Sequence, residues 1–197
     1  MPEFSPRLLR AFLLTLTTEL SGDKLPIILE TAGLSPQIAD VKAGAILDAS
    51  ACAQAYADIQ KAIRSYYGRG ARGILLRVGA QLWHRLLNDA PLTVKPQITF
   101  ARGLATKDNP KPALDLAAKL FSTKPGDLTV HTLDRDLLLV DHPSHAAAAQ
   151  RDDESICWVT MGLIREALYW ATGREYDLVE ISCCATGGKQ CEFKVTR

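Results

Sequence analysis

Apolar residues in the first half of the chain recur at intervals of three and four, which is typical of helices with one buried face. This pattern predicts a helix over residues 5–20 and a shorter one over residues 24–32. A third helix, capped by Asp48 or Ser50, is expected to bury four large groups: Tyr56, Ile59, Ile63 and Tyr66. A fourth, over residues 70–88, is expected to place four more on one face: Ile74, Val78, Leu82 and Leu86.

The pattern changes in the second half. Residues 91–110 are expected to be irregular, and Pro112 suits the first turn of a fifth helix that runs to Phe121. Alternating apolar residues over 128–132 and 137–141 flank the polar turn at 134–136 and predict a hairpin. Residues 144–153 are small and polar, and they are expected to form a loop or the lead-in to a helix.

The last 41 residues predict one more helix and a second hairpin. The helix carries a core-facing stripe that begins at Cys157 and ends before Gly173, which is placed to cap it. Residues 176–184 and 191–196 then read as two strands joined by a glycine-containing turn. Helices first and two hairpins later predict an α+β fold, with the helices packed on one face of an antiparallel sheet.

Composition fits one soluble domain over residues 1–197, with N-terminal helices over 1–50 and a core over 51–197. Of the residues, 47% are hydrophobic and 23% are charged, and the net charge is +1. So small a charge gives no long-range attraction for nucleic acid or an anionic membrane. The N-terminal apolar run is interrupted by Arg10 and Glu19, so we expect neither a signal peptide nor a membrane span. A cytoplasmic location is expected because the five cysteines come without an export signal.

Four of the five cysteines lie at positions 157, 183, 184 and 191. The predicted hairpin brings Cys183 close to Cys191, the preceding helix can supply Cys157, and Glu180 is the nearest carboxylate. Three thiolates and a carboxylate favour a zinc ion. In a regular strand Cys184, not Cys183, shares the face of Glu180, so either a bulge or the strand end reorients Cys183, or Cys184 is the ligand. The alternative is that these buried cysteines simply fill the core.

The C-terminal region resembles the vinyl-4-reductase domain family. The resemblance rests on residues 157–163 (CWVTMGL), 172–176 (TGREY), 180–187 (EISCCATG) and 191–193 (CEF), and more loosely on residues 66–73. In aromatic-sensing members a zinc ion is held with the spacing Cys-x22-Glu-x2-Cys-x7-Cys, which Cys157, Glu180, Cys183 and Cys191 reproduce. The resemblance implies these four ligands, a fold similar to TRAPP subunits, a homodimer and a hydrophobic or aromatic ligand. A zinc ion with four protein ligands is expected to be structural.

Other patterns predict no catalytic centre. Residues 68–73 match G-x-G-x-x-G, but a helical pattern precedes them where a dinucleotide site needs a strand, so we expect a tight junction between helices. His142 and His145 are expected at the surface, and no Ser-His-Asp grouping is recognisable. Trp158 and Tyr169 share the helix of Cys157 and are the predicted ligand-binding residues.

The sequence therefore favours a zinc-containing domain that binds a small molecule in an apolar cavity, as a sensor or carrier. A second hypothesis is an accessory or reductase protein that acts on the vinyl group of a chlorophyll-type tetrapyrrole, as the family name suggests. A third is a structural adaptor with a filled core and no ligand.

Overall fold

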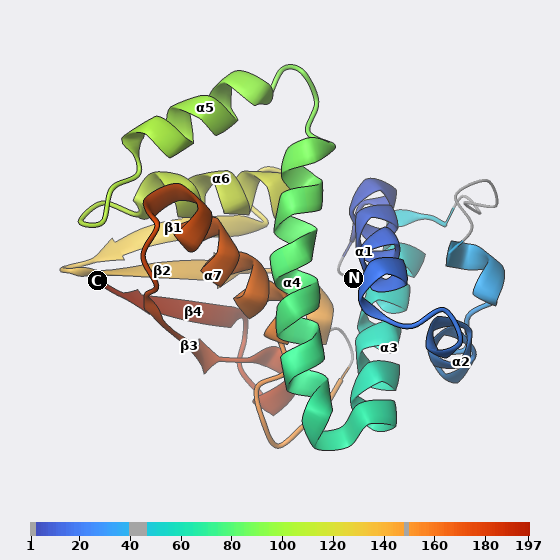
Figure 1. The fold of residues 1–197 in the computed structure, drawn as a ribbon. Coiled ribbons are helices and arrows are strands. Elements are labelled where there is room, and N and C mark those ends of the chain that lie inside the picture. The colour runs from blue at the N-terminus through green and yellow to red at the C-terminus, as the bar shows by residue number, and fades with distance from the viewer. Residues whose placement is uncertain (1–2, 40–46, 148–149) are drawn as a thin grey trace.

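The computed structural model describes residues 3–39, 47–147 and 150–197, and Figure 1 shows a helical half followed by a mixed half. The helices are α1 (Pro6–Glu19), α2 (Lys24–Thr31), α3 (Ala49–Tyr67), α4 (Ala71–Asn88), α5 (Lys95–Leu104), α6 (Lys111–Phe121) and α7 (Trp158–Thr172). The strands are β1 (Leu128–Leu133), β2 (Asp136–Asp141), β3 (Asp177–Ser182) and β4 (Cys191–Thr196). Short 3₁₀ turns are η1 (Pro36–Ala39), η2 (Gly68–Gly70), η3 (His145–Ala147) and η4 (Cys184–Thr186). Of the predicted loop over 144–153, residues 148–149 lie outside the described residues.

The four strands form one antiparallel sheet in the order β1-β2-β4-β3, so two hairpins are joined through β2 and β4. On the inner face Leu139 opposes Phe193, and both side chains are fully buried. On the outer face Val179 and Ile181 are more than half exposed. Because successive side chains of a strand point to opposite faces, the helices cover one face only. This confirms the predicted α+β fold and both hairpins.

Local capping explains where several helices begin and end. The Ser5 hydroxyl accepts a hydrogen bond from the Leu8 amide at the start of α1, and the Asp48 carboxylate accepts one of 2.7 Å from the Ala51 amide at the start of α3. Of the two predicted caps for α3, Asp48 is therefore the one used. Gly173 ends α7 with a φ of 66°, as predicted, because glycine adopts the left-handed conformation without a Cβ clash.

The closest helix contact is the crossing of α4 and α7. A Cβ atom on Gly162 of α7 would clash with the carbonyl of Leu76, and one on Gly79 of α4 would clash with the carbonyl of Val159. In Figure 1, α4 runs between α7 on one side and α1 on the other. The crossing therefore fixes α7, and with it Cys157, against the N-terminal helices.

The glycines of residues 68–73 play a different part from the one predicted. Residues 68–70 join α3 directly to α4, so the expected tight junction between helices is present. The glycines do not permit close packing there, because a Cβ on Gly68, Gly70 or Gly73 would meet no described atom within 4 Å. Gly68 instead turns the chain between α3 and α4, with a φ of 53°. Helix α3 precedes this turn, which agrees with the absence of a dinucleotide-binding strand.

The expected burial of Tyr66 is also wrong, because its side chain is 45% exposed. Tyr66 lies ten residues after Tyr56, and ten steps of about 100° leave it roughly 80° away from the buried face. Tyr67, one residue later, returns to that face and packs against the core.

Helix α5 lies within residues 91–110, which the sequence pattern predicts as irregular. Of its side chains only Ala101 is buried, while Phe100 and Leu104 are exposed. Only Ile98 and Ala101 of this helix contact the core among the described residues, and two positions over ten residues are too few for periodicity to reveal it. Among the described helices, none is both long and apolar enough to cross a bilayer.

Candidate metal centre

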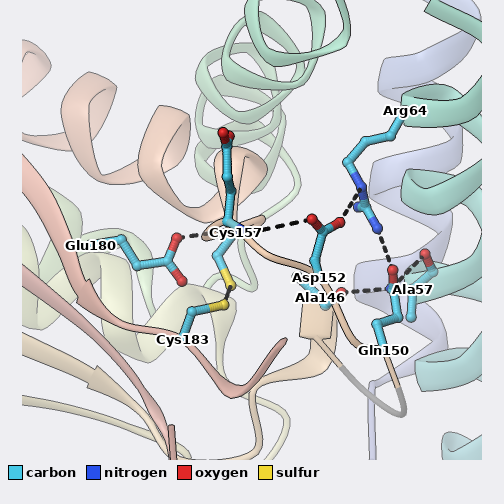
Figure 2. A network of polar contacts seen from close by, with 9 residues as sticks. Ala57, Arg64, Ala146, Gln150, Asp152, Cys157, Glu180 and Cys183 are labelled. Atoms are coloured by element: carbon cyan, nitrogen blue, oxygen red, sulfur yellow. Dashed lines mark hydrogen bonds and ion pairs between the residues drawn. The ribbon is translucent and has the colours of Figure 1, made fainter. Parts of the chain in front are cut away.

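Three cysteines and one glutamate meet where the start of α7 lies against the β3–β4 hairpin. They are Cys157, Glu180, Cys183 and Cys191, and their ligand atoms all lie within 4.8 Å of one another. The Cys157 sulfur is 3.4 Å from that of Cys191 and 3.8 Å from that of Cys183, and the remaining pair is 3.9 Å apart. The three thiols are fully buried and Glu180 is half-buried. Figure 2 shows Cys157, Glu180 and Cys183 turned toward one another.

A bulge in β3 brings Cys183 to the same side as Glu180. Glu180 pairs with Phe193 and Ser182 pairs with Glu192, so Ile181 is an extra residue that has no paired residue on β4. An extra residue reverses the alternation of side chains beyond it. Cys183 therefore joins the cluster, as one of the two sequence interpretations required, whereas the Cys184 sulfur lies 3.2 Å from the Ser144 hydroxyl.

Ser144 organises the region around the cluster. Its hydroxyl donates to the Asp141 carbonyl and accepts a 3.0 Å hydrogen bond from the Cys191 amide. Its own amide donates to the Asp141 carboxylate at 2.9 Å. The Cys184 amide donates to the Cys191 sulfur at 3.4 Å, and the Cys157 amide donates to the Glu180 carboxylate at 3.2 Å. Backbone N–H groups thus point at two of the four candidate ligands.

Without a cation, the cluster holds protons. The sulfur atoms are too far apart for disulfides, and all five cysteines are free. Hydrogen bonds with Cys183 and Cys191, together with burial, raise the pKa of Cys157. The same contacts lower the pKa of Cys183, because its sulfur receives hydrogen bonds from the other two thiols. Burial raises the pKa of Glu180 to about 8. A divalent cation would reverse this balance by stabilising the deprotonated groups.

The four groups fit a tetrahedral zinc site. Thiolates at the usual Zn–S distance would lie about 3.8 Å apart in a regular tetrahedron, and the observed sulfur separations are 3.4, 3.8 and 3.9 Å. The second oxygen of Glu180, Oε1, is buried and has no hydrogen-bond partner in the described part of the chain. A buried carboxylate oxygen without a donor is costly unless a cation or water meets it.

A second network, drawn in Figure 2, ties α3 to the chain that leads into Cys157. The Nε atom of Arg64 lies 3.9 Å from the Asp152 carboxylate, and its Nη2 atom donates to the Gln150 side chain. Gln150 donates in turn to the carbonyls of Ala57 and Ala146, at 3.1 and 2.9 Å. The sequence did not indicate these residues, because partners 86 positions apart leave no local pattern.

Three buried polar side chains lie deeper in the interior, also missed by sequence reasoning. Both ring nitrogens of His145, the Tyr56 hydroxyl and the Gln60 carbonyl oxygen are buried without partners among the residues described. Phe4 stacks on Tyr56 at 4.4 Å between ring centroids and lies 5.0 Å from the His145 ring. The prediction that His145 is a surface residue is wrong, because η3 packs against α3 and leaves it 1% exposed. Burial lowers the pKa of His145 to about 4, which keeps its ring neutral; His142 is exposed, as expected.

The two predicted ligand-binding residues lie far apart on α7. Trp158 is half-buried, packs against the core and directly follows Cys157. Tyr169 is 52% exposed and lines a surface pocket with Arg165, Arg174 and Tyr176. Eleven residues of helix separate them by about 16 Å. That they contact a ligand stays a prediction.

Comparison with known proteins adds a family-model match over part of the chain and a likeness of fold. Residues 139–197 match the model of the vinyl-4-reductase domain, which confirms the resemblance for that segment. An H-NOX protein from S. oneidensis in the Fe(II) state has 13% sequence identity and a TM-score of 0.57, over 98% of this chain and 95% of that one. The Fe(II)NO state of an H-NOX protein from the same organism has 12% identity and a TM-score of 0.56, over 97% of both chains. No curated protein matches the chain. At these identities the structural likeness shows the fold alone, and the similarity to TRAPP subunits stays a prediction.

Proposed function

With residues 139–197 matching the vinyl-4-reductase domain, we propose that this chain is a small-molecule-binding domain, a sensor or carrier, with a structural zinc ion. The observation that carries the proposal is the convergence of four groups within 4.8 Å: Cys157, Glu180, Cys183 and Cys191. They come from the start of α7, from β3 and the residue after it, and from β4. An ion held by all four would cross-link the hairpin to the helix.

Bound zinc would supply cross-linking energy and no reactive position, since four protein ligands complete its tetrahedron. The chain's own residues prepare the site. Cys157 sits at the N-terminal end of α7, which the α4 crossing holds in place, and Ser144 positions Cys191 through its amide. Because ligands must lose protons to bind zinc, metal binding is coupled to folding of this region.

The ligand is the second part of the proposal. An unpaired buried polar atom costs about 1–3 kcal/mol, and four such atoms belong to Tyr56, Gln60 and His145. These groups lie among aromatic rings, including Phe4 and Phe12. A hydrophobic or aromatic molecule with one hydroxyl group would pair with up to three of them, because a hydroxyl donates one hydrogen bond and accepts two. A neutral His145 suits an uncharged ligand, because it presents one donor and one acceptor.

Elemental analysis and native mass spectrometry of the purified protein test both parts. We expect one zinc ion per chain and an additional organic mass that is released on denaturation. Absence of zinc after purification without chelators, together with no uptake of added zinc, would overturn the metal assignment. A chain that holds zinc but has no bound or bindable organic molecule would favour the structural-adaptor hypothesis.

A second candidate function follows from the match to the vinyl-4-reductase domain: an accessory or reductase protein for the vinyl group of a chlorophyll-type tetrapyrrole. Absorbance separates it from the first. A co-purifying tetrapyrrole would give a strong Soret band, and a colourless ligand would not.

We also propose that residues 1–197 act as one domain, that two copies pair as a homodimer, and that the protein works in the cytoplasm, where thiols stay reduced. The native mass reports the number of chains directly. A mass of one chain at micromolar concentration would contradict the homodimer.

A further inference from the structure

The proposed metal centre carries a net negative charge. Zinc contributes +2, and three thiolates and one carboxylate contribute −4, which leaves −2 on a group whose three sulfur atoms are fully buried. Burying charge is unfavourable unless an opposite charge or hydrogen-bond donors compensate for it. The centre therefore needs a cation nearby as well as the backbone N–H groups already described.

Arg64 on α3 is a mostly buried cation that contacts the segment leading into Cys157. Its side chain is 13% exposed, although arginine is rarely buried without partners. Burial lowers the pKa of Arg64, while the negative charges of Asp152, Cys157 and Cys183 raise it, so this guanidinium and two of the candidate ligands act on one another. A guanidinium keeps its proton in proteins, which makes the positive charge permanent.

The contacts of Arg64 also hold the chain on both sides of the centre. Its guanidinium contacts Gln150 and Asp152, on the segment that leads into Cys157 (Figure 2). The Asp152 amide donates at 3.1 Å to the carbonyl of Ala185, in the turn that follows Cys183. The Nη1 atom is buried and has no hydrogen-bond partner in the described residues. The contacts with Asp152 and Gln150 therefore leave one nitrogen of the guanidinium without an acceptor.

We propose that Arg64 is a positioning residue of the metal centre: it holds the 150–152 segment that orients Cys157, and its charge offsets the excess negative charge of the zinc-bound ligands. The inference rests on the proposed zinc site. It adds a link from α3 to that site, although α3 supplies no ligand.

Zinc affinity of Arg64 variants, measured by competition with a chromogenic chelator, tests the inference. Arg64→Met removes both the charge and the contacts, and we expect its affinity to fall roughly 10- to 100-fold, as for other residues that support metal ligands. Arg64→Lys keeps the charge and is expected to recover part of that loss. Arg151→Met is the matched control, because Arg151 lies on the same segment but is exposed; we expect wild-type affinity.

Thiol reactivity gives a second readout. In the zinc-loaded protein, a disulfide reagent should modify the cluster thiols faster in Arg64→Met than in the wild type or in Arg151→Met. If Arg64→Met does not fold, Arg64→Gln replaces it in both measurements. Wild-type affinity in a folded, neutral Arg64 variant would overturn the inference, and equal loss in Arg64→Lys and Arg64→Met would overturn the role of charge. Failure of the wild type itself to bind zinc would instead overturn the proposed function.

Discussion

At the scale of single residues, two adjacent cysteines have different surroundings. The Cys183 sulfur lies 3.8 and 3.9 Å from the other two cluster sulfurs, while the Cys184 sulfur contacts the Ser144 hydroxyl. Sequence alternation alone left both possible, because a regular strand would turn Cys184 toward Glu180. The bulge at Ile181, in the pairing of β3 with β4, decides between them.

Replacing Cys191, a proposed ligand, and replacing Cys184, which lies outside the cluster, should therefore affect zinc binding differently. We expect Cys191→Ser to lose zinc, and Cys184→Ser to keep it. At free zinc a thousandfold above the wild-type Kd, loss of binding lowers stability by about 4 kcal/mol. Elemental analysis and thermal melting of the two variants measure this. Zinc loss in Cys184→Ser would instead favour Cys184 over Cys183 as the ligand.

His145 should make stability depend on pH. Its pKa is about 4 in the fold, where burial disfavours the charged ring, and about 6.5 in an unfolded chain. The unfolded chain therefore takes up the proton first, and stability falls as pH drops from 6.5 toward 4. At pH 5 the loss is about 2 kcal/mol relative to about pH 8.

The contribution of His145 is isolated by comparing His145→Phe with the wild type in urea unfolding at about pH 8 and about pH 5, since other groups titrate in both proteins. Between about pH 8 and about pH 5 the wild type should lose about 2 kcal/mol more stability than His145→Phe, because only the wild type carries the buried imidazole. His131→Phe, at an exposed site, is the control. An equal pH response in wild type and His145→Phe would show that His145 is not buried as a neutral ring.

At the scale of elements, the crossing of α4 and α7 places the ligand-bearing helix. Its two glycines, Gly79 and Gly162, let the two backbones touch. The sequence drew attention to residues 68–73 instead, because a motif of spaced glycines is visible in one segment. A single glycine on each of two helices far apart in the chain gives no comparable signal.

An alanine at this crossing should be destabilising. Gly162→Ala would push a methyl group into the backbone of α4, and we expect a loss of roughly 2–3 kcal/mol, at the upper end of the usual cost of overpacking. Gly73→Ala, on α4 but facing open space, should be neutral or stabilising by about 0.5–1 kcal/mol because alanine favours helix. Chemical unfolding of both variants measures the contrast. Equal stability of the two would contradict the tight crossing.

Element prediction from the sequence succeeded where one face is buried. Helices α1, α3, α4, α6 and α7 carry apolar stripes, and the hairpins show alternation, so their positions followed from periodicity. Helix α5 was missed because it buries only Ala101. The four clustered site residues followed from spacing and family resemblance, whereas Arg64 and His145 depend on contacts between distant segments.

At the scale of the whole molecule, the candidate metal centre lies between two groups of elements. It belongs to α7 and the β3–β4 hairpin, while α4 and Arg64 of α3 connect it to the N-terminal helices. Loss of the proposed ion is therefore expected to lower the stability of the main core as well as that of the hairpin, because α7 also forms part of the core.

Removal of zinc should lower the melting temperature of the whole domain in one transition. For about 4 kcal/mol of lost metal binding, a domain of this size shifts by roughly 10 °C. Calorimetry with and without a strong chelator measures the shift, and Cys191→Ser should not respond to the chelator. A separate low-temperature transition in the chelated protein would mean that the hairpin detaches alone.

The fluorescence of the three tryptophans should report on this arrangement. Trp83 and Trp170 form an edge-to-face pair across the α4–α7 crossing, with ring centroids 5.5 Å apart, while Trp158 directly follows Cys157. Emission from the pair should report the packing of the two helices, and emission from Trp158 should report the occupancy of the ion site. A coloured ion such as cobalt(II) in place of zinc would quench Trp158 most strongly, so one spectrum would follow both events without an added dye.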